Sequence, residues 1–224
     1  MGAEGFFSEE ENQRISATIK AVEGETAGEI AVLVVEESDT YPEAILLGAV
    51  ILGGLAALAL TDLFLDDSLW LFIPCLVAGA LVAALVLQRI PVLHRLFVSP
   101  QQINRRVAAR AEQAFYARGL HRTREGSGVL FFLSLFERQV WVLADQGIYR
   151  KIDQEALQAY ARAVVLGMKN GRKTEALCAE IVRFGRVLAH HFPIRPDDVN
   201  ELSNEVMVEA KGSSTRALGQ GPLP

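Results

Sequence analysis

The chain of 224 residues lacks the features of several common protein classes. Its two cysteines, Cys75 in an apolar run and Cys178 in a helical pattern, are expected to lie far apart, which argues against a disulfide or a cysteine metal site. The N-terminal segment is acidic and has neither the positive nor the apolar region of a secretory signal, so we expect it to stay in the cytoplasm. The formal net charge of -5 also excludes nucleic acid as an expected partner.

Charge is absent from two long runs, Ala44 to Leu60 and Leu69 to Leu87. As helices they would extend about 26 and 29 Å, close to the roughly 30 Å of a bilayer's hydrocarbon core. The alternative is a pair of buried helices in a soluble protein, but neither run has an amphipathic stripe. We therefore predict that residues 44–98 form a transmembrane helical hairpin and an interfacial segment, with the lipid bilayer as a partner.

The charges around these runs predict an orientation. The connection between them contains three Asp residues and no Lys or Arg. The segment after the second run is basic, with Arg89, Arg95, Arg105, Arg106 and Arg110. Because basic residues stay on the cytoplasmic side, we expect a two-helix protein of the inner (plasma) membrane with both termini in the cytoplasm.

Small residues recur at four-residue spacing in both runs. The first run has Ala49, Gly53 and Ala57, and the second has Cys75, Gly79 and Ala83. Such stripes favour close approach of two helix backbones. We expect the two helices to pack along them.

The remaining sequence predicts a single discontinuous α/β domain formed by residues 1–43 and 99–205. Ser8 and Glu11 have the spacing of a capping box at a helix start, and Pro100 occupies a first helical position. Two further helices are expected over residues 153–169 and 174–191, separated by the stop signal Asn170-Gly171. Residues 206–224 lack a pattern able to bury a core and are predicted to be a disordered tail.

Three strands are expected in this domain. Gly28 to Glu37 is a continuous β-branched run of the kind found in a central strand covered on both faces. Val129 to Leu135 and Gln139 to Ala144 are predicted to form a hairpin through a short polar turn containing Glu137. The prediction is a small sheet in βαββ order flanked by helices, with the transmembrane hairpin inserted after the first strand.

Two stretches carry a resemblance to a known family. They are FFSEEENQRISATIKAVEGETAGEIAVLVVE and AEQAFYARGLHRTREGSGVLFFLSLFERQVWVLADQGI, with a T-x-GEI strand entry and a GL-x-x-T…GVL approach to the hairpin. In these stretches the chain resembles the TPM domain family. The resemblance implies a βαββ sheet with flanking helices, a role in assembly, repair or regulation of membrane complexes, and, in some members, weak metal-linked phosphatase activity. Many members have an N-terminal signal and a C-terminal anchor, and this chain departs on both points.

Two carboxylates are candidate metal ligands. Asp145 follows the third predicted strand and Glu29 begins the first, and carboxylates at strand ends can bind a hard cation such as Ca²⁺ or another divalent ion through oxygen. Asp145-Gln146-Gly147 is also a good turn sequence, so the aspartate has a structural explanation as well. His121 has no visible partner in the sequence and is expected to be exposed.

No catalytic constellation is visible in the sequence. Neither cysteine has an Arg six residues later, and there is no phosphate-cradling glycine loop. We therefore expect an interaction module acting in the assembly or maintenance of other membrane proteins. The alternative is a weak metal-dependent phosphatase-like hydrolase, which rests on the resemblance alone.

Overall fold

The computed structural model describes every residue except 1, 65–68, 91–92, 94, 195–203 and 210–224. The chain divides into two compact units. Residues 1–38 and 106–224 form an α/β unit, and residues 39–105 form a helical unit.

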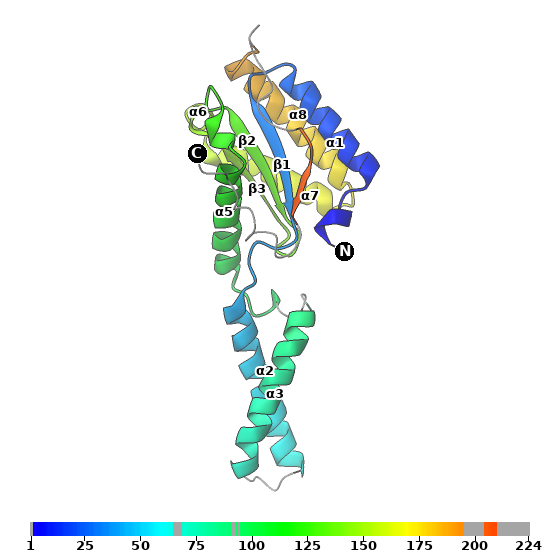
Figure 1. Ribbon diagram of the computed structural model, residues 1–224, viewed down its shortest axis with the longest axis vertical. Helices are drawn as coiled ribbons and strands as arrows, with labels where there is room; N and C mark the ends of the chain where they lie inside the picture. The colour runs from blue at the N-terminus through cyan, green and yellow to red at the C-terminus, as the bar shows by residue number, and fades with distance from the viewer. Residues whose placement is uncertain (1, 65–68, 91–92, 94, 195–203, 210–224) are drawn as a thin grey trace, which may run out of the picture. The chain divides into compact units, whose positions relative to one another are not determined.

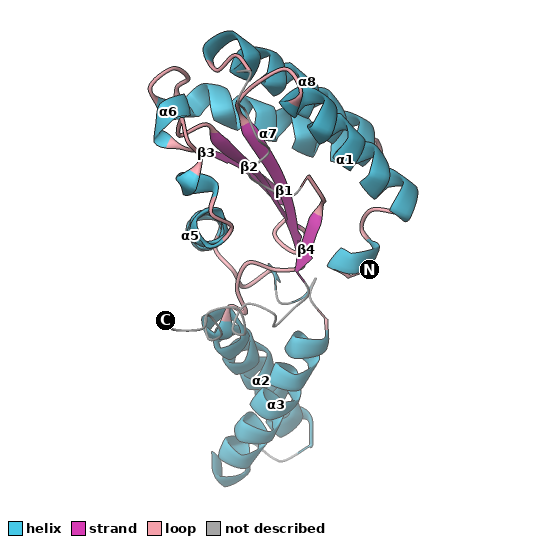
Figure 2. Ribbon diagram, turned by 45° about the horizontal axis from the view of Figure 1, so that its top comes forward, coloured by secondary structure: helices cyan, strands magenta, loops and turns pink. Residues whose placement is uncertain are grey.

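The α/β unit is built on a mixed sheet of four strands in the order β3-β2-β1-β4 (Figure 2). The strands are β1 (Glu29–Val35), β2 (Gly128–Ser134), β3 (Gln139–Ala144) and β4 (Met207–Glu209). β1 runs parallel to both of its neighbours, β2 and β4, whereas β3 is antiparallel to β2. All seven residues of β1 are buried, which confirms the prediction of a central strand covered on both faces.

Helices lie on both faces of this sheet (Figures 1 and 2). One face is covered by α1 (Glu9–Glu23), α7 (Gln154–Lys169) and α8 (Lys173–His191), and α5 (Pro100–Ala117) lies against the other. The shorter elements of the unit are η1 (Ala3–Gly5), η2 (Leu120–Arg122) and α6 (Gln146–Tyr149). This placement leaves the apolar side chains of the inner strands shielded from water on both sides.

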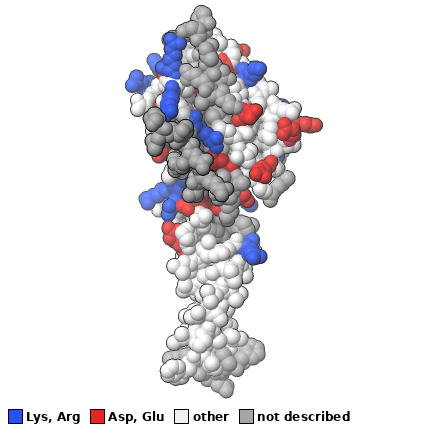
Figure 3. All heavy atoms as spheres, viewed as in Figure 1, with Lys and Arg blue, Asp and Glu red and all other residues white. Residues whose placement is uncertain are grey.

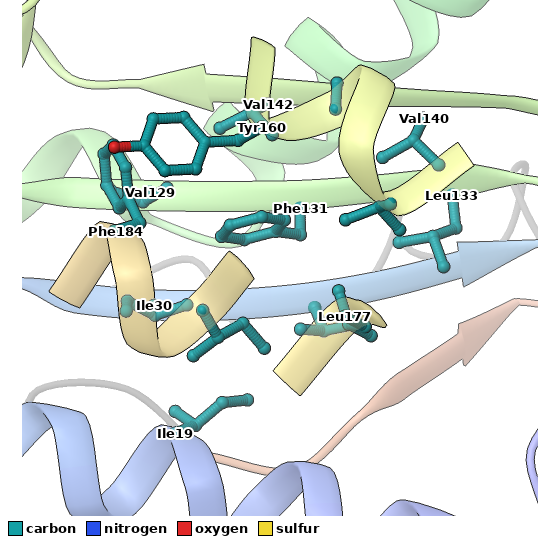
Figure 4. Close-up of a cluster of buried hydrophobic side chains, with 14 of the residues drawn as sticks. Ile19, Ile30, Val129, Phe131, Leu133, Val140, Val142, Tyr160, Leu177 and Phe184 are labelled. Atoms are coloured by element: carbon teal, nitrogen blue, oxygen red, sulfur yellow. The ribbon is translucent and has the colours of Figure 1, made fainter. Parts of the chain in front are cut away.

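The main core lies between the sheet and the helices α1, α7 and α8 (Figure 4). Alternate residues of β1 and β2, such as Ile30 and Phe131, point into it because successive side chains of a strand face opposite sides. Phe184 of α8 is fully buried, with its ring centroid 6.3 Å from that of Phe131 and 5.0 Å from that of Tyr160 in edge-on contacts. Such edge-on pairs add to the stabilisation that comes from burial.

The local start and stop signals of the helices are confirmed. The Ser8 hydroxyl accepts a hydrogen bond from the Glu11 backbone N–H at 3.2 Å, and the Glu11 carboxylate accepts one from the Ser8 N–H at 2.7 Å. α5 begins at Pro100. Gly119 and Gly171 follow helices with φ of 75° and 73°, a left-handed conformation that glycine adopts without strain.

The helical unit contains two apolar helices, α2 (Pro42–Phe64) and α3 (Leu69–Arg89), which are long and apolar enough to cross a membrane. They cross at Gly53 and Gly79, since a Cβ placed on Gly53 would lie 2.4 Å from the backbone nitrogen of Ala80. This contact confirms close packing along the stripes of small residues. The visible surface of the hairpin carries almost no charge along its length (Figure 3).

One prediction about the end of the chain is wrong. Residues 206–224 were expected to be a disordered tail, but Met207–Glu209 form the edge strand β4 beside β1. Three residues are too few for a recognisable strand pattern, and the pairing comes from the exposed hydrogen-bonding groups of β1. The rest of the expected tail, residues 210–224, lies outside the described residues, as do Asp66 and Asp67 of the acidic turn.

Candidate functional site

The two candidate metal ligands lie at the same end of the sheet. Glu29 is opposite Gly128 in the β1–β2 register, and the Asp145 backbone N–H donates to the Gly128 carbonyl at 2.9 Å. The two residues therefore flank β2 from opposite sides. Neighbouring strands are about 4.8 Å apart, so two strand spacings, about 10 Å, separate their backbones.

Asp145 lines an open cleft with a volume of about 690 Å³ in the α/β unit. The cleft is bordered by α5, by the turn before β2, and by the corner where β3 enters α6. Its acidic lining residues are Glu112, Glu125 and Asp145, and its aromatic ones are Phe115, Tyr116 and Tyr149. A volume of this size falls within the range of small-ligand sites in proteins.

Two glycines shape the cleft wall. A Cβ on Gly147 would lie 2.5 Å from the Glu125 carbonyl oxygen and 2.6 Å from that of Gly126, so no larger residue fits there. Gly126 itself has a φ of 64°. The turn before β2 and the start of α6 therefore pack backbone to backbone, which fixes Asp145 at the cleft rim.

Asp145 has a structural role of its own. It is the N-cap of α6, and its Oδ1 accepts a hydrogen bond from the Gln146 N–H at 2.7 Å. The expected turn at Asp145-Gln146-Gly147 is thus the first turn of a short helix. Aspartate is among the preferred N-cap residues, so this position is explained without a ligand.

The described residues do not form a ligand set for a metal ion. No group of three His, Cys, Asp or Glu side chains among them could hold one ion. Ca²⁺ usually takes six to eight oxygen ligands, and Glu29 lies across β2 from Asp145 and does not line the cleft. The metal-linked chemistry implied by the resemblance does not fit this arrangement.

Aromatic side chains in the cleft were not singled out by sequence reasoning. Burial, together with the nearby Glu112 charge, raises the pKa of Tyr149, while a backbone hydrogen bond at Ala144 opposes the rise. The ring of His121 lies 5.2 Å from that of Tyr116, and His121 is half-buried rather than exposed as expected. These residues come from segments about 30 positions apart, so no sequence motif connects them.

Glu29 belongs to a different environment, at the outer edge of β1. Its side chain is buried, with 7% exposed, and it lies close enough to Glu23 for their charges to interact. Glu23 accepts hydrogen bonds from the Ile30 N–H at 2.8 Å and from the Asn204 side-chain amide. Burial first, and the Glu29 charge second, raise the pKa of Glu23 to about 7.

A third carboxylate, Glu137 of the predicted polar turn, is buried. It lies in the β2–β3 turn but is only 1% exposed. It accepts hydrogen bonds from the Ser134 hydroxyl and from the Ser38 backbone N–H, the latter at 2.9 Å. Glu137 therefore fixes the chain just after β1, and the Ser-x-x-Glu spacing was the one local hint of this role.

Comparison with known proteins adds information on the fold. No protein-family model matches the chain, and a search of curated proteins finds no match. Among solved structures, the chain is similar to the NMR structure of BA42 protein from the psychrophilic bacterium Bizionia argentinensis. The two are 19% identical, the match covers 91% of this chain and 96% of that one, and the TM-score is 0.57. At this level of identity the similarity shows a shared fold and leaves the activity open.

Proposed function

We propose that this chain is a membrane-anchored interaction module whose hairpin holds the α/β unit at a bilayer for contact with other membrane proteins. The exposure of the hairpin's large apolar side chains carries the proposal. Trp70 is 89% exposed, and Leu63 and Leu81 are also mostly exposed. A core helix of a soluble protein would bury such side chains, whereas a lipid environment accommodates them on all sides.

The orientation follows from the charges that flank the hairpin. We place both termini in the cytoplasm and the acidic turn outside the plasma membrane, because Arg residues resist translocation whereas Asp residues have little effect. A reporter active only outside the cytoplasm should be silent when fused after Arg124. The same reporter should be active when inserted between Asp66 and Asp67, and the reverse pattern would overturn the orientation.

We also assign the α/β unit to the TPM domain family. Support comes from the T-x-GEI entry into β1, from the GL-x-x-T…GVL approach to β2, and from the order helix, strand, helix, strand hairpin and two helices. An alignment of homologues that keeps both motifs at these positions would support the assignment. An alignment in which neither motif persists would remove it.

Co-purification from native membranes tests the interaction function. The full chain, extracted in mild detergent after cross-linking, should recover a reproducible set of membrane proteins. A variant with Tyr116→Ala and Glu112→Gln alters the cleft, and Glu155→Gln on the exposed surface of α7 is the matched control. If the cleft takes part, the cleft variant should recover less of the partner than the control does.

Two results would contradict the proposal. One is the absence of any reproducible partner in cross-linked membranes. The other is turnover of a phosphoester by the purified chain that is lost in Asp145→Asn, a variant that keeps an effective N-cap on α6. The second result would replace the interaction module with a hydrolase.

A further inference from the structure

Residues 204–209 lie along the outer edge of β1 and end in the shortest strand of the sheet. β4 pairs with β1 over three residues, from Leu33 opposite Met207 to Val35 opposite Glu209. Its residues are partly exposed, and Val206 and Val208 pack at the margin of the core. Little apolar burial therefore holds this segment in place.

One end of the segment is fixed by Glu23 of α1. The Asn204 amide donates to one oxygen of the Glu23 carboxylate, and the Ile30 N–H donates to the other at 2.8 Å. Glu23 thus accepts a hydrogen bond from the Ile30 N–H, in the part of the β1 edge that β4 does not reach. The same carboxylate joins α1, β1 and the start of the segment.

The other end is fixed by two arginines, Arg110 of α5 and Arg118 in the turn after it. Glu209 accepts hydrogen bonds from Arg110 and from Arg118, the latter at 2.6 Å. The Arg110 and Glu209 side chains are mostly buried, which reduces the screening of their interaction by water. The Glu209 carbonyl also accepts the Glu36 N–H at 3.2 Å, so the clamp lies where the β1–β4 ladder ends.

We propose that residues 204–209 form a strap that opens and closes over the β1 edge while the rest of the α/β unit stays folded. The strap is fastened by the Asn204–Glu23 contact at one end and by the Arg110–Glu209–Arg118 clamp at the other. When it opens, the edge of β1 can receive an extended segment of another polypeptide. This partner role rests on the proposed interaction function, whereas the opening itself does not.

The contrast between the two sides of β1 favours local opening. On one side β1 pairs with β2 over seven residues that are buried on both strands, and on the other it pairs with β4 over three partly exposed residues. Segments with few buried apolar contacts open at lower free energy than the core. Once exposed, the unpaired backbone groups of a sheet edge are a template for an added strand.

Hydrogen–deuterium exchange of the full chain in detergent tests the opening. Glu209→Gln weakens the clamp and Asn204→Ala weakens the other fastening, while Glu175→Gln removes the exposed Arg14–Glu175 pair between α1 and α8 as a matched control. In each strap variant the peptide covering residues 33–37 should exchange about 10-fold faster, since charged hydrogen bonds are worth about that factor or more. The peptide covering residues 129–133 should not change, and the control should leave both peptides unaffected.

Two outcomes would overturn the strap. Unchanged exchange at residues 33–37 in both strap variants would show that the contacts do not fasten it, and an equal rise at residues 129–133 would show unfolding of the whole unit. A separate experiment tests the partner role: a peptide with the sequence of residues 204–209, NEVMVE, is added to the Glu209→Gln variant. Protection of residues 33–37 by this peptide, and not by a scrambled one, supports an added strand. If the peptide gives no protection, the partner role is wrong, and the opening is then judged by the exchange of the strap variants alone.

Discussion

Replacing Glu23 by Gln should stabilise the α/β unit at alkaline pH. The Glu23 carboxylate is half-buried beside Glu29, and burial raises its pKa to about 7. The folded state therefore binds a proton at Glu23 more tightly than the unfolded state, in which the pKa is close to 4.5. Gln keeps an oxygen for the Ile30 N–H and carries no charge, and its amide N–H can donate to the Asn204 side-chain oxygen once that amide turns over.

The raised pKa sets both the sign and the size of the effect. The stabilisation by this proton is fully present below pH 4.5 and is lost as pH rises from about 4.5, where the unfolded state releases the proton, to about 7, where the folded state does. The free energy of unfolding of the native chain should therefore fall over that range. A pKa difference between 4.5 and about 7 corresponds to at most about 3.4 kcal/mol. Because Glu23 is partly exposed, solvent screening lowers the expected effect to about 1–2 kcal/mol.

The assay is urea unfolding followed by Trp141 fluorescence. The chain has two tryptophans, and Trp70→Phe removes the one in the hairpin, so that the signal comes from β3. Glu23→Gln should match its parent at pH 4.5 and exceed it by about 1–2 kcal/mol at pH 8. Glu155→Gln, at an exposed position of α7, should follow the parent at both pH values. A Gln variant that is less stable than its parent at pH 8 would refute the reasoning.

Three further predictions concern packing. Gly53→Ala should lower the stability of the hairpin in detergent by about 1–3 kcal/mol, because the added Cβ would enter the facing backbone and force α2 away from α3. Gly54→Ala is the control and should change little, since the nearest atom to its Cβ would be 3.7 Å away. Gly147→Ala should destabilise the α/β unit by about 1–3 kcal/mol in the Trp141 assay, whereas Gly5→Ala meets no atom within 4 Å and should be neutral. Phe184→Ala should cost about 3–5 kcal/mol in that assay, and a loss below about 1 kcal/mol would contradict its place at the centre of the core.

Elements with a local physical cause could be predicted from the sequence. The capping box at Ser8 and Glu11 joins groups three residues apart, and the helix start at Pro100 depends on the ring of one residue. The hairpin helices follow from length and the absence of charge. In each case the signal that decides the structure lies within one continuous stretch of sequence.

The candidate site was predicted less completely, because its parts come from distant segments. The sequence identified Asp145 and Glu29 as carboxylates at strand ends. It did not reveal that β2 separates them, nor that Asp145 shares a cleft with Tyr116 and Tyr149. Strand order determines these distances, and strand order is a property of the whole sheet.

What the sequence by itself determined is therefore the mixed α/β class, the central strand and two apolar helices, since periodicity, capping and hydropathy act locally. Only the tertiary structure decided that Met207–Glu209 add a fourth strand, that Glu137 is buried, and that Glu23 lies beside Glu29. These features depend on polar groups that remain exposed at a sheet edge or a turn until a distant segment supplies a partner. Which segment pairs with these groups depends on the path by which the chain returns to the sheet, and no single stretch of sequence determines that path.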